Sequence, residues 1–354
     1  MPLGAVPMTR RAATVLASGI CFVILLGIMF VVPVPFVSWS PGVAQNALGS
    51  FDNRPVVEVD GKAGPPTSGQ LLMIPTAITR PGSQLTFPEA LGDYLAAHRD
   101  VQPRDWVYPV GQSAAELDAA RIAGIKTAQQ SATVAALRVA GVEVRQNPVV
   151  SSVSTGGPSY RLLTVGDIVE TVNGTSVQTS AEVSEIVSGL TVGDPVKFGI
   201  VRQGASMDVT VTTQASASSR DVPRIGITMD EGYRYAPHPE FAMDERNQNS
   251  SSGLMLALAL YERVSNQDIT GGRIIAGTGT IEPTGAVGVT RGIDEKVYAA
   301  ERLGASVFLV PASNCSEAHR LSTRMTLVKV NKLDDAVNSL HALNTIPNAV
   351  VPTC

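Results

Sequence analysis

Two short segments carry the residue types of greatest chemical interest in this chain. The first is Asn249-Ser250-Ser251-Ser252-Gly253, directly before an apolar run, and the second is Gly292-Ile293-Asp294-Glu295-Lys296. A serine where a helix begins and a lysine on a later helix are the two halves of a Ser/Lys dyad, in which the amine removes the hydroxyl proton. The pair therefore predicts nucleophilic hydrolysis, with Ser251 and Lys296 as the reacting groups.

The lysine can act as a base only if its environment removes its charge. An ordinary lysine has a pKa of about 10.4, so at neutral pH it is a cation that accepts no proton. Lys296 falls in the first turn of an amphipathic helix expected over residues 294–303, where the helix dipole disfavours positive charge. Burial in an apolar pocket together with that dipole could lower the pKa by about three units.

Each member of the proposed dyad also has a purely structural interpretation. Serine or asparagine before an apolar helix is the ordinary N-cap preference, and Glu295 beside Lys296 could form a surface ion pair with it. The spacing of later residues favours the chemical interpretation, because glycines at 271, 272, 277 and 279 lead through Pro283-Thr284-Gly285 to a predicted hairpin just before Lys296.

Other chemistries find no support in the sequence. A Ser-His-Asp triad would need one of four histidines, none of which lies in a recognisable motif: His98, His238, His319 and His341. There is no H-E-x-x-H pattern, so no metal is expected, and Gly61-Lys62 lacks the phosphate-loop spacing, so neither ATP nor another cofactor is expected. A net charge of -4 and a pI near 5.6 offer no basic surface, which argues against nucleic acid as a partner.

The N-terminus has the composition of a membrane segment. Residues 12–32 are almost wholly apolar and about as long as a bilayer core requires. A cleaved signal peptide would have a shorter apolar core and a small-x-small exit, so an uncleaved anchor is favoured. Arg10 and Arg11 precede the span, which predicts that residues 1–11 are cytoplasmic and that the rest of the chain lies outside the cytoplasm.

Two of the three cysteines would then face an oxidising compartment. Cys21 lies in the apolar segment, whereas Cys315 and Cys354 lie near the end of the sequence. A bridge between Cys315 and Cys354 and a pair of idle thiols are equally open alternatives.

The remaining chain is expected to form an α+β multidomain protein. Residues 33–134 carry short apolar runs, a helix over 88–98 and a long helix that starts at a capping box formed by Ser113 and Glu116. Residues 135–214 have the pattern of a small β-rich module, a serine-rich linker is expected over 215–221, and an α/β domain over 222–342 precedes a tail over 343–354.

The β-rich module resembles a bacterial PDZ domain. The residues that carry the resemblance are Gly166, Asp167, Ile168, Val169, Val172, Asn173, Gly174 and Val177, followed by a short helix and an R-x-G hairpin. This resemblance implies a groove in which an extended peptide adds as an extra strand. The expected entrance loop of that groove is Gly141, Val142, Glu143 and Val144.

Residues 222–342 resemble the proteolytic domain of Lon-type peptidases, and the whole chain is similar to the membrane-anchored, PDZ-containing Lon-like proteases of Gram-positive bacteria. The family's G-P-S-A-G motif falls on residues 249–253, which implies that Ser251 is the nucleophile, and its G-[LI]-x-x-K element falls on residues 292–296. Thr278-Gly279 matches a dipeptide whose threonine orients the lysine, and residues 308–314 match the family's closing strand and loop. The resemblance also allows a homo-oligomer.

Asn249, Ser250 and Ser252 depart from the family motif. The register rests on Gly253, and a slip by one residue would make Ser250 or Ser252 the nucleophile. The amides that open the helix, at Ser252 and Gly253, are the expected oxyanion donors.

Two functions follow as hypotheses. The favoured one is an ATP-independent, membrane-tethered serine endopeptidase that cleaves extracytoplasmic protein or peptide substrates and uses the PDZ-like module for binding or regulation. The alternative is a catalytically inactive membrane adaptor.

Overall fold

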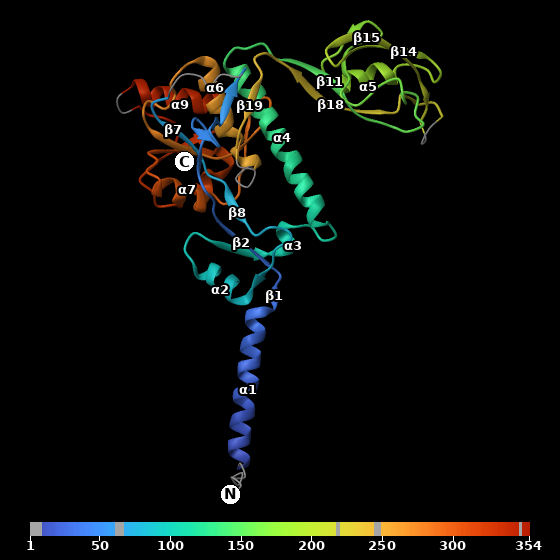
Figure 1. Cartoon of the computed structure of the whole chain (residues 1–354). Helices are drawn as coiled ribbons and strands as arrows, with labels where there is room; N and C mark the ends of the chain where they lie inside the picture. Colours follow the sequence, from blue (N-terminus) through green and yellow to red (C-terminus); the bar gives the residue numbers. More distant parts are fainter. Residues whose placement is uncertain (1–8, 61–66, 217–219, 244–248, 347–348) are drawn as a thin grey trace. The chain divides into compact units, whose positions relative to one another are not determined.

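The computed structural model describes residues 9–60, 67–216, 220–243, 249–346 and 349–354. The chain forms two compact units: the first combines the residues up to 140 with Pro239–Cys354, and the second is Gly141–His238. We call them the sheet unit and the inserted unit (Figure 1).

These boundaries correct the expected domain plan. The expected linker over 215–221 starts inside a ribbon, because β16 (Gln214–Ala215) pairs with β17 (Pro223–Arg224); residues 217–219 lie outside the described part. Strand β18 (Ile227–Arg234) then pairs with β11 (Arg145–Val153), so residues 222–238 belong to the inserted unit and not to the α/β domain.

The region expected over 33–134 is likewise not a domain of its own. The sheet unit is built on a five-stranded sheet of order β24-β23-β20-β7-β3, to which the early strands β7 and β3 contribute. All pairs are parallel except β3 with β7. The strands are β3 (Gln45–Asn46), β7 (Gln70–Met73), β20 (Ile274–Gly277), β23 (Val307–Pro311) and β24 (Thr326–Val330).

Alternation along these strands sends side chains into two separate cores. Leu71, Ile275 and Leu309 face one core, which is shared with α4 (Ala114–Val139), α6 (Gly253–Ser265) and α9 (Leu333–Thr345). Their neighbours Leu72, Ala276 and Phe308 face the other core, which contains residues of α7 (Ile293–Arg302) and α8 (Cys315–Ala318). The sheet therefore lies between two helical layers, as expected for an α/β domain.

Three short ribbons complete the central part of the sheet unit. They are β4 (Ser50–Phe51) with β5 (Arg54–Pro55), β6 (Val57–Val59) with β19 (Pro239–Phe241), and β21 (Thr280–Ile281) with β22 (Val287–Gly288). The last is the hairpin predicted before Lys296. Two 3₁₀ turns, η1 (Ser250–Ser252) and η2 (Ala312–Asn314), precede α6 and α8.

The N-terminal part begins with α1 (Arg10–Val31), the one helix of the described residues that is long and apolar enough to cross a membrane. After it come two small sheets, β1 (Pro33–Val34) with β9 (Leu85–Thr86), and the order β10-β2-β8. These last strands are β2 (Phe36–Pro41), β8 (Thr76–Ile78) and β10 (Asp100–Pro103), accompanied by α2 (Phe87–Leu95) and α3 (Arg104–Val107). The predicted helices of this region are confirmed, and α4 starts at the predicted capping box of Ser113 and Glu116.

The inserted unit is an antiparallel sheet of order β15-β14-β12-β11-β18 with one main helix, α5 (Ser180–Ser188). Its strands include β12 (Ile168–Val172), β13 (Thr175–Ser176), β14 (Pro195–Arg202) and β15 (Ala205–Thr212). The predicted hairpin of β14 and β15 is confirmed, with Val196 opposite Val211.

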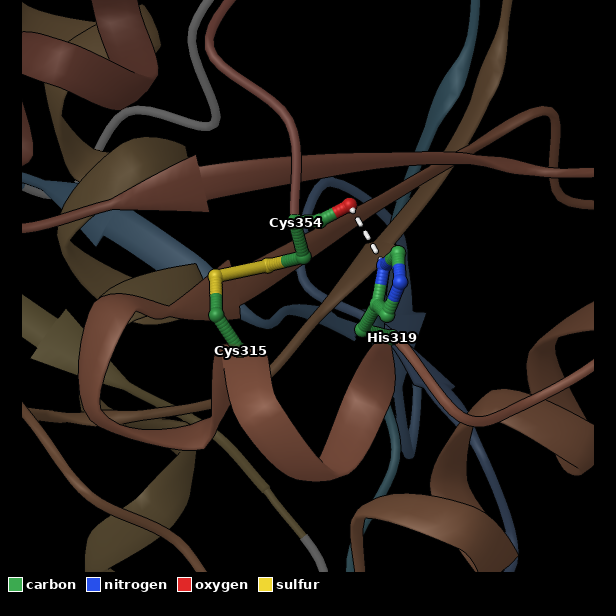
Figure 2. The surroundings of a disulfide bond; sticks show 3 residues. All are labelled: Cys315, His319 and Cys354. Atoms are coloured by element: carbon green, nitrogen blue, oxygen red, sulfur yellow. Dashed lines mark hydrogen bonds between the residues drawn. A yellow bond between two sulfur atoms is a disulfide. The ribbon is translucent and has the colours of Figure 1, made fainter.

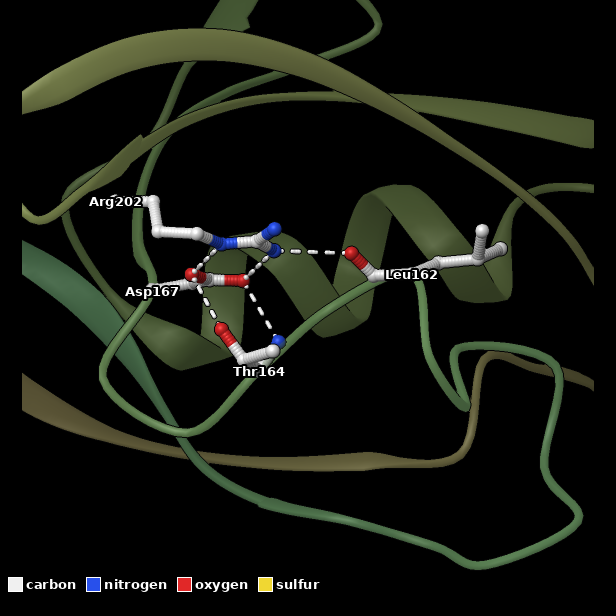
Figure 3. A network of polar contacts seen from close by, with 4 residues as sticks. All are labelled: Leu162, Thr164, Asp167 and Arg202. Carbon is white, nitrogen blue, oxygen red and sulfur yellow. Dashed lines mark hydrogen bonds and ion pairs between the residues drawn. The ribbon is translucent and has the colours of Figure 1, made fainter.

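The Gly-Asp pair of this unit has a structural role that Figure 3 shows. The buried carboxylate of Asp167 accepts hydrogen bonds from Nε and Nη2 of Arg202, each at 2.7 Å, and from the amide and hydroxyl of Thr164. Burial alone would raise the pKa of Asp167, but these bonds outweigh it and the pKa is lowered. The motif thus fixes the end of β14 to the loop before β12.

Cys315 and Cys354 form a disulfide (Figure 2). The bridge joins the first residue of α8 to Cys354, and Nδ1 of His319 lies 3.3 Å from the carbonyl oxygen of Cys354. Of the two alternatives left open by the sequence, the bridge is therefore the one that the structure contains.

Candidate active site

The site lies at the carboxyl edge of the parallel strands, where ligands of α/β sheets usually bind. Ser251 stands before α6 on one face of the sheet, whereas Lys296 comes from α7 on the other face. Thr278 directly follows β20. Two helices on opposite faces can meet only beyond the end of a strand, and this position brings the three residues together.

The serine is presented by a tight loop. The carbonyl of Ser251 accepts the amide of Gly279 at 2.8 Å, and the amide of Leu254 donates to the carbonyl of Gly279 at 3.1 Å. A Cβ atom on Gly253 would lie 3.0 Å from Cγ2 and 3.2 Å from the amide nitrogen of Ile281. A side chain at position 253 would therefore press on Ile281, so the glycine after the serines suits this close approach between α6 and β21.

The lysine amine reaches the serine directly. Nζ of Lys296 lies 3.0 Å from Oγ of Ser251, 3.0 Å from Oγ1 of Thr278 and 2.6 Å from Oγ1 of Thr290. All three partners are hydroxyl groups, which can accept from or donate to an amine. The structure thus brings together Ser251, Thr278 and Lys296 as the sequence predicted.

Burial changes the chemistry of this amine. Only 1% of Lys296 is exposed, and desolvation lowers its pKa from 10.5 to about 8, although the charge of Glu295 acts in the opposite direction. Glu295 is itself buried, and burial raises its pKa. The purely structural alternative, a surface ion pair between Glu295 and Lys296, is therefore wrong.

Thr290 is a site residue that the sequence reasoning missed. Its backbone amide donates to Oδ1 of Asn314 and its carbonyl accepts Nδ2 of the same side chain, each at 2.9 Å. Asn314 belongs to η2, just after β23, so a second strand end supports the lysine. A threonine two residues before the glycine that opens a helix carries no spacing signal, and only the fold reveals it.

Asn249 holds the serine hydroxyl. Oγ of Ser251 donates to Oδ1 of Asn249 at 2.8 Å, and Oγ of Ser252 lies 3.3 Å from the same oxygen. In this arrangement the serine proton points to Asn249, while the amine donates to the serine.

The expected oxyanion donors are not free in this arrangement. The amide of Ser252 donates to the carbonyl of Asn249 at 3.2 Å, and the amide of Gly253 donates to the carbonyl of Ser250. The sequence suggested amides left unpaired at a helix start, but the 3₁₀ turn pairs them internally. They become oxyanion donors only if that turn opens.

The expected peptide-binding loop is also placed elsewhere. Gly141, Val142, Glu143 and Val144 connect α4 to β11, and the Glu143 carboxylate pairs with Arg145. A peptide can add only to a free sheet edge, and β11 lies between β12 and β18. Of the two edge strands, β18 contacts α5, so the groove predicted beside a helix would lie along β18.

No group of three potential metal ligands from His, Cys, Asp and Glu occurs among the residues that the structure describes. His98 stacks on Tyr298 with ring centroids 3.6 Å apart, and its Nδ1 lies 3.4 Å from the Asp294 carboxylate. His98 therefore bonds elsewhere, and the hydrogen-bond partners of the Ser251 hydroxyl are the Lys296 amine and the Asn249 side-chain amide.

Comparison with known proteins identifies the inserted unit. Residues 124–213 match the PDZ domain family. The chain is 32% identical over 97 residues to the periplasmic pH-dependent serine endoprotease DegQ of Escherichia coli (strain K12), a match that covers 27% of this chain and 21% of DegQ. The chain thus spans about a fifth of the length of this curated relative.

Solved structures were also found to be similar to part of this chain. The PDZ domains of SdrC-like proteins from Listeria monocytogenes and Listeria innocua each show 25% identity and cover 23% of this chain, with TM-scores of 0.22. The matches cover 86% and 92% of those chains. The family match shows that the chain contains a PDZ domain, which is preceded by an apolar helix and joined to an α/β region that contains Ser251 and Lys296.

Proposed function

We propose that this chain is an ATP-independent, membrane-anchored serine endopeptidase with a Ser251–Lys296 dyad in a Lon-type proteolytic domain. The observation that carries the proposal is the 3.0 Å contact between Nζ of a fully buried Lys296 and Oγ of Ser251. The partial similarity to a serine endoprotease supports it.

The two threonines determine which way the neutral amine faces. An uncharged amine has two N–H donors and one lone pair. If Thr278 and Thr290 accept the two N–H groups, the lone pair is left for the Ser251 hydroxyl. The hydroxyl proton then turns from Asn249 to Nζ, and Oγ attacks the peptide carbonyl while Lys296 becomes a cation.

The second half of the reaction returns the proton. Lys296 gives its proton to the leaving amine, so the peptide bond breaks and the acyl group stays on Ser251. Water then loses a proton to the neutral lysine and attacks the ester. As the bond to Oγ breaks and the acid leaves, Lys296 returns that proton to Oγ, which restores the serine hydroxyl and the neutral amine. Opening of η1 would free the amides of Ser252 and Gly253 for the developing oxyanion.

The PDZ domain and α1 suggest the setting. An extended segment of a protein or peptide substrate could pair with β18, which is an edge strand of this sheet among the described residues. Uncleaved, α1 would hold the chain in the cell membrane with its N-terminus in the cytoplasm and the dyad outside it, where the Cys315–Cys354 disulfide would also be stable.

Peptide cleavage by the full chain in detergent tests this proposal. Ser251→Ala should abolish cleavage, whereas the matched variant Ser250→Ala, one residue away in the same turn, should retain it. Equal activity of the wild type and Ser251→Ala would contradict the proposal.

The second candidate function is a PDZ-containing membrane adaptor without catalysis. It is favoured by the closed η1 turn, in which the Ser251 hydroxyl donates to Asn249 and both oxyanion amides are paired. An adaptor would bind peptides equally well in the wild type and in Ser251→Ala, and neither protein would cleave them.

A further inference from the structure

The chain returns to the end of α1 at residues 85–86, directly before α2. Helix α1 ends at Val31, and β1 then pairs Pro33 with Thr86 and Val34 with Leu85. Because α2 begins at Phe87, its first turn lies beside the end of α1, and the two helices contact each other (Figure 1). Helix α2 therefore starts close to the level at which α1 would leave a bilayer.

One face of α2 is apolar and exposed. The exposed fractions are 40% for Phe87, 44% for Leu91, 70% for Tyr94 and 74% for Leu95. Spacings of four, three and one residues place these side chains on one side of a helix. The acidic residues Glu89 and Asp93 fall on the opposite side, so the apolar stripe carries no charge.

A second element, bonded to the chain just after β1, exposes another aromatic residue. The amide of Arg104, the first residue of α3, donates to the carbonyl of Pro35 at 2.9 Å. Trp106, two residues later, is 75% exposed. A tryptophan so exposed is unusual in water, because the indole ring is mostly apolar.

We propose that these five side chains form a membrane-exit patch that inserts into the interfacial layer of the bilayer around α1. The patch is defined as Phe87, Leu91, Tyr94, Leu95 and Trp106. The inference rests on the proposed role of α1 as an anchor.

The chemistry of the patch fits the proposed partner. Tryptophan and tyrosine are enriched where hydrocarbon meets headgroups, because their rings are apolar and their polar atoms can stay hydrated. Short amphipathic helices lie in the same layer with their apolar face buried by about 5–10 Å. Pairing of β1 with β9 would hold α2 at that depth.

A second copy of this chain is the other occupant that an apolar face could take. The position of α2 favours lipid, because the β1–β9 pairing keeps its start next to the hydrophobic end of α1 in every molecule. If α1 is in a membrane, the surface nearest to the patch is the bilayer itself.

The chain has natural probes for both the anchor and the patch. It has only two tryptophans, Trp39 and Trp106, and Trp39 is buried with 7% exposure. The full chain would be placed in phosphatidylcholine vesicles that carry bromine on the upper part of their acyl chains. Bromine quenches tryptophan emission at contact, so quenching present in the wild type and lost in Trp106→Phe would place Trp106 in the interface.

Insertion of α1 into the membrane is measured separately, through the reactivity of Cys21. Cys21 lies within α1, and the other two cysteines form the disulfide. Protection of Cys21 from a water-soluble maleimide in vesicles, with reaction after detergent is added, reports insertion of α1. Cys21 that reacts without detergent would defeat the anchor proposal and, with it, the patch.

A protected Cys21 with tryptophan quenching equal in the wild type and Trp106→Phe would overturn the patch alone. The triple variant Leu91→Ser, Tyr94→Ser and Leu95→Ser adds an independent measurement. It should reduce the quenching of Trp106 while Cys21 stays protected. Trp106 could instead lack bromine quenching and become shielded from a water-soluble quencher only at a high ratio of protein to lipid. That result would identify a contact between copies and overturn the proposal.

Discussion

Nζ of Lys296 lies closer to Oγ1 of Thr290, at 2.6 Å, than to Oγ of Ser251, at 3.0 Å. Thr290 is in turn clamped by Asn314, which bonds both its amide and its carbonyl. The amine is thus held in place by a residue that takes no part in the proposed bond changes. This arrangement makes Thr290 a positioning residue for the lysine.

Thr290→Val should reduce kcat by about 10- to 100-fold, which is part of the usual contribution of a general base, and leave KM nearly unchanged. Valine keeps the shape but removes the acceptor that holds the amine. A protonated amine needs three acceptors and a neutral amine only two, so the variant should also move the activity limb to lower pH. Steady-state kinetics across pH would measure both effects.

The matched control is Thr290→Ser, which keeps a hydroxyl and should recover most of the activity. If valine and serine reduced kcat equally, or if the pH limb did not move, the hydroxyl of Thr290 would have no role in positioning the amine.

The activity of the wild type should rise with pH to a midpoint near 8. The pKa of Lys296 is lowered from 10.5 to about 8 because the ammonium is desolvated, and only the neutral amine accepts the serine proton. Below that midpoint the rate should fall about tenfold per pH unit, as the neutral fraction does. Single-turnover cleavage between pH 5 and 9 checks this, and a flat profile over that range would speak against a lysine base.

The same lowered pKa predicts how stability depends on pH. Between about 8 and 10.5 the unfolded lysine binds a proton that the folded lysine does not, so the free energy of unfolding rises with pH across this window. The total rise is about 3 kcal/mol. Lys296→Met removes the titrating group, so the variant should lack that rise.

Urea unfolding of both proteins from pH 7 to pH 10.5 measures this difference. Parallel curves for the wild type and Lys296→Met would show that the lysine has the same pKa in the folded and unfolded chains.

Loss of the disulfide should destabilise the sheet unit. Cys315 and Cys354 are 39 residues apart in sequence, and closing such a loop in the unfolded chain is worth about 3–4 kcal/mol. The double variant Cys315→Ser and Cys354→Ser should therefore unfold at a lower temperature in thermal scans. Cys21→Ser is the control and should unfold like the wild type, and a double variant as stable as Cys21→Ser would contradict the expectation.

Local sequence signals pointed to Ser251 and Lys296 as candidate residues because both positions have distinctive near neighbours in the sequence. Gly253 follows the serines where α6 packs on Ile281, and Lys296 opens an amphipathic helix, so both positions carry a pattern. The Gly166-Asp167 pair likewise identified the PDZ domain, because the Asp167 carboxylate is held by Arg202 and Thr164. Residue types that are set by local contacts of this kind can be recognised in the sequence.

What the sequence could not show depends on long-range pairing. The parallel contact of β7 with β20 joins Leu71 to Ile275, which merges two segments expected to be separate domains. The addition of β18 to β11 moves the domain boundary for the same reason. Thr290, Asn314 and Asn249 reach the site from loops whose paths are set by the whole fold.

The most direct test of the central claim is covalent labelling by a fluorophosphonate, which reacts with serines activated by a neighbouring base. Peptide mapping by mass spectrometry should find the adduct on Ser251 in the wild type and in Ser250→Ala, and no adduct in Lys296→Met. An unlabelled wild type, or labelling of Ser251 that persists in Lys296→Met, would contradict activation of Ser251 by Lys296.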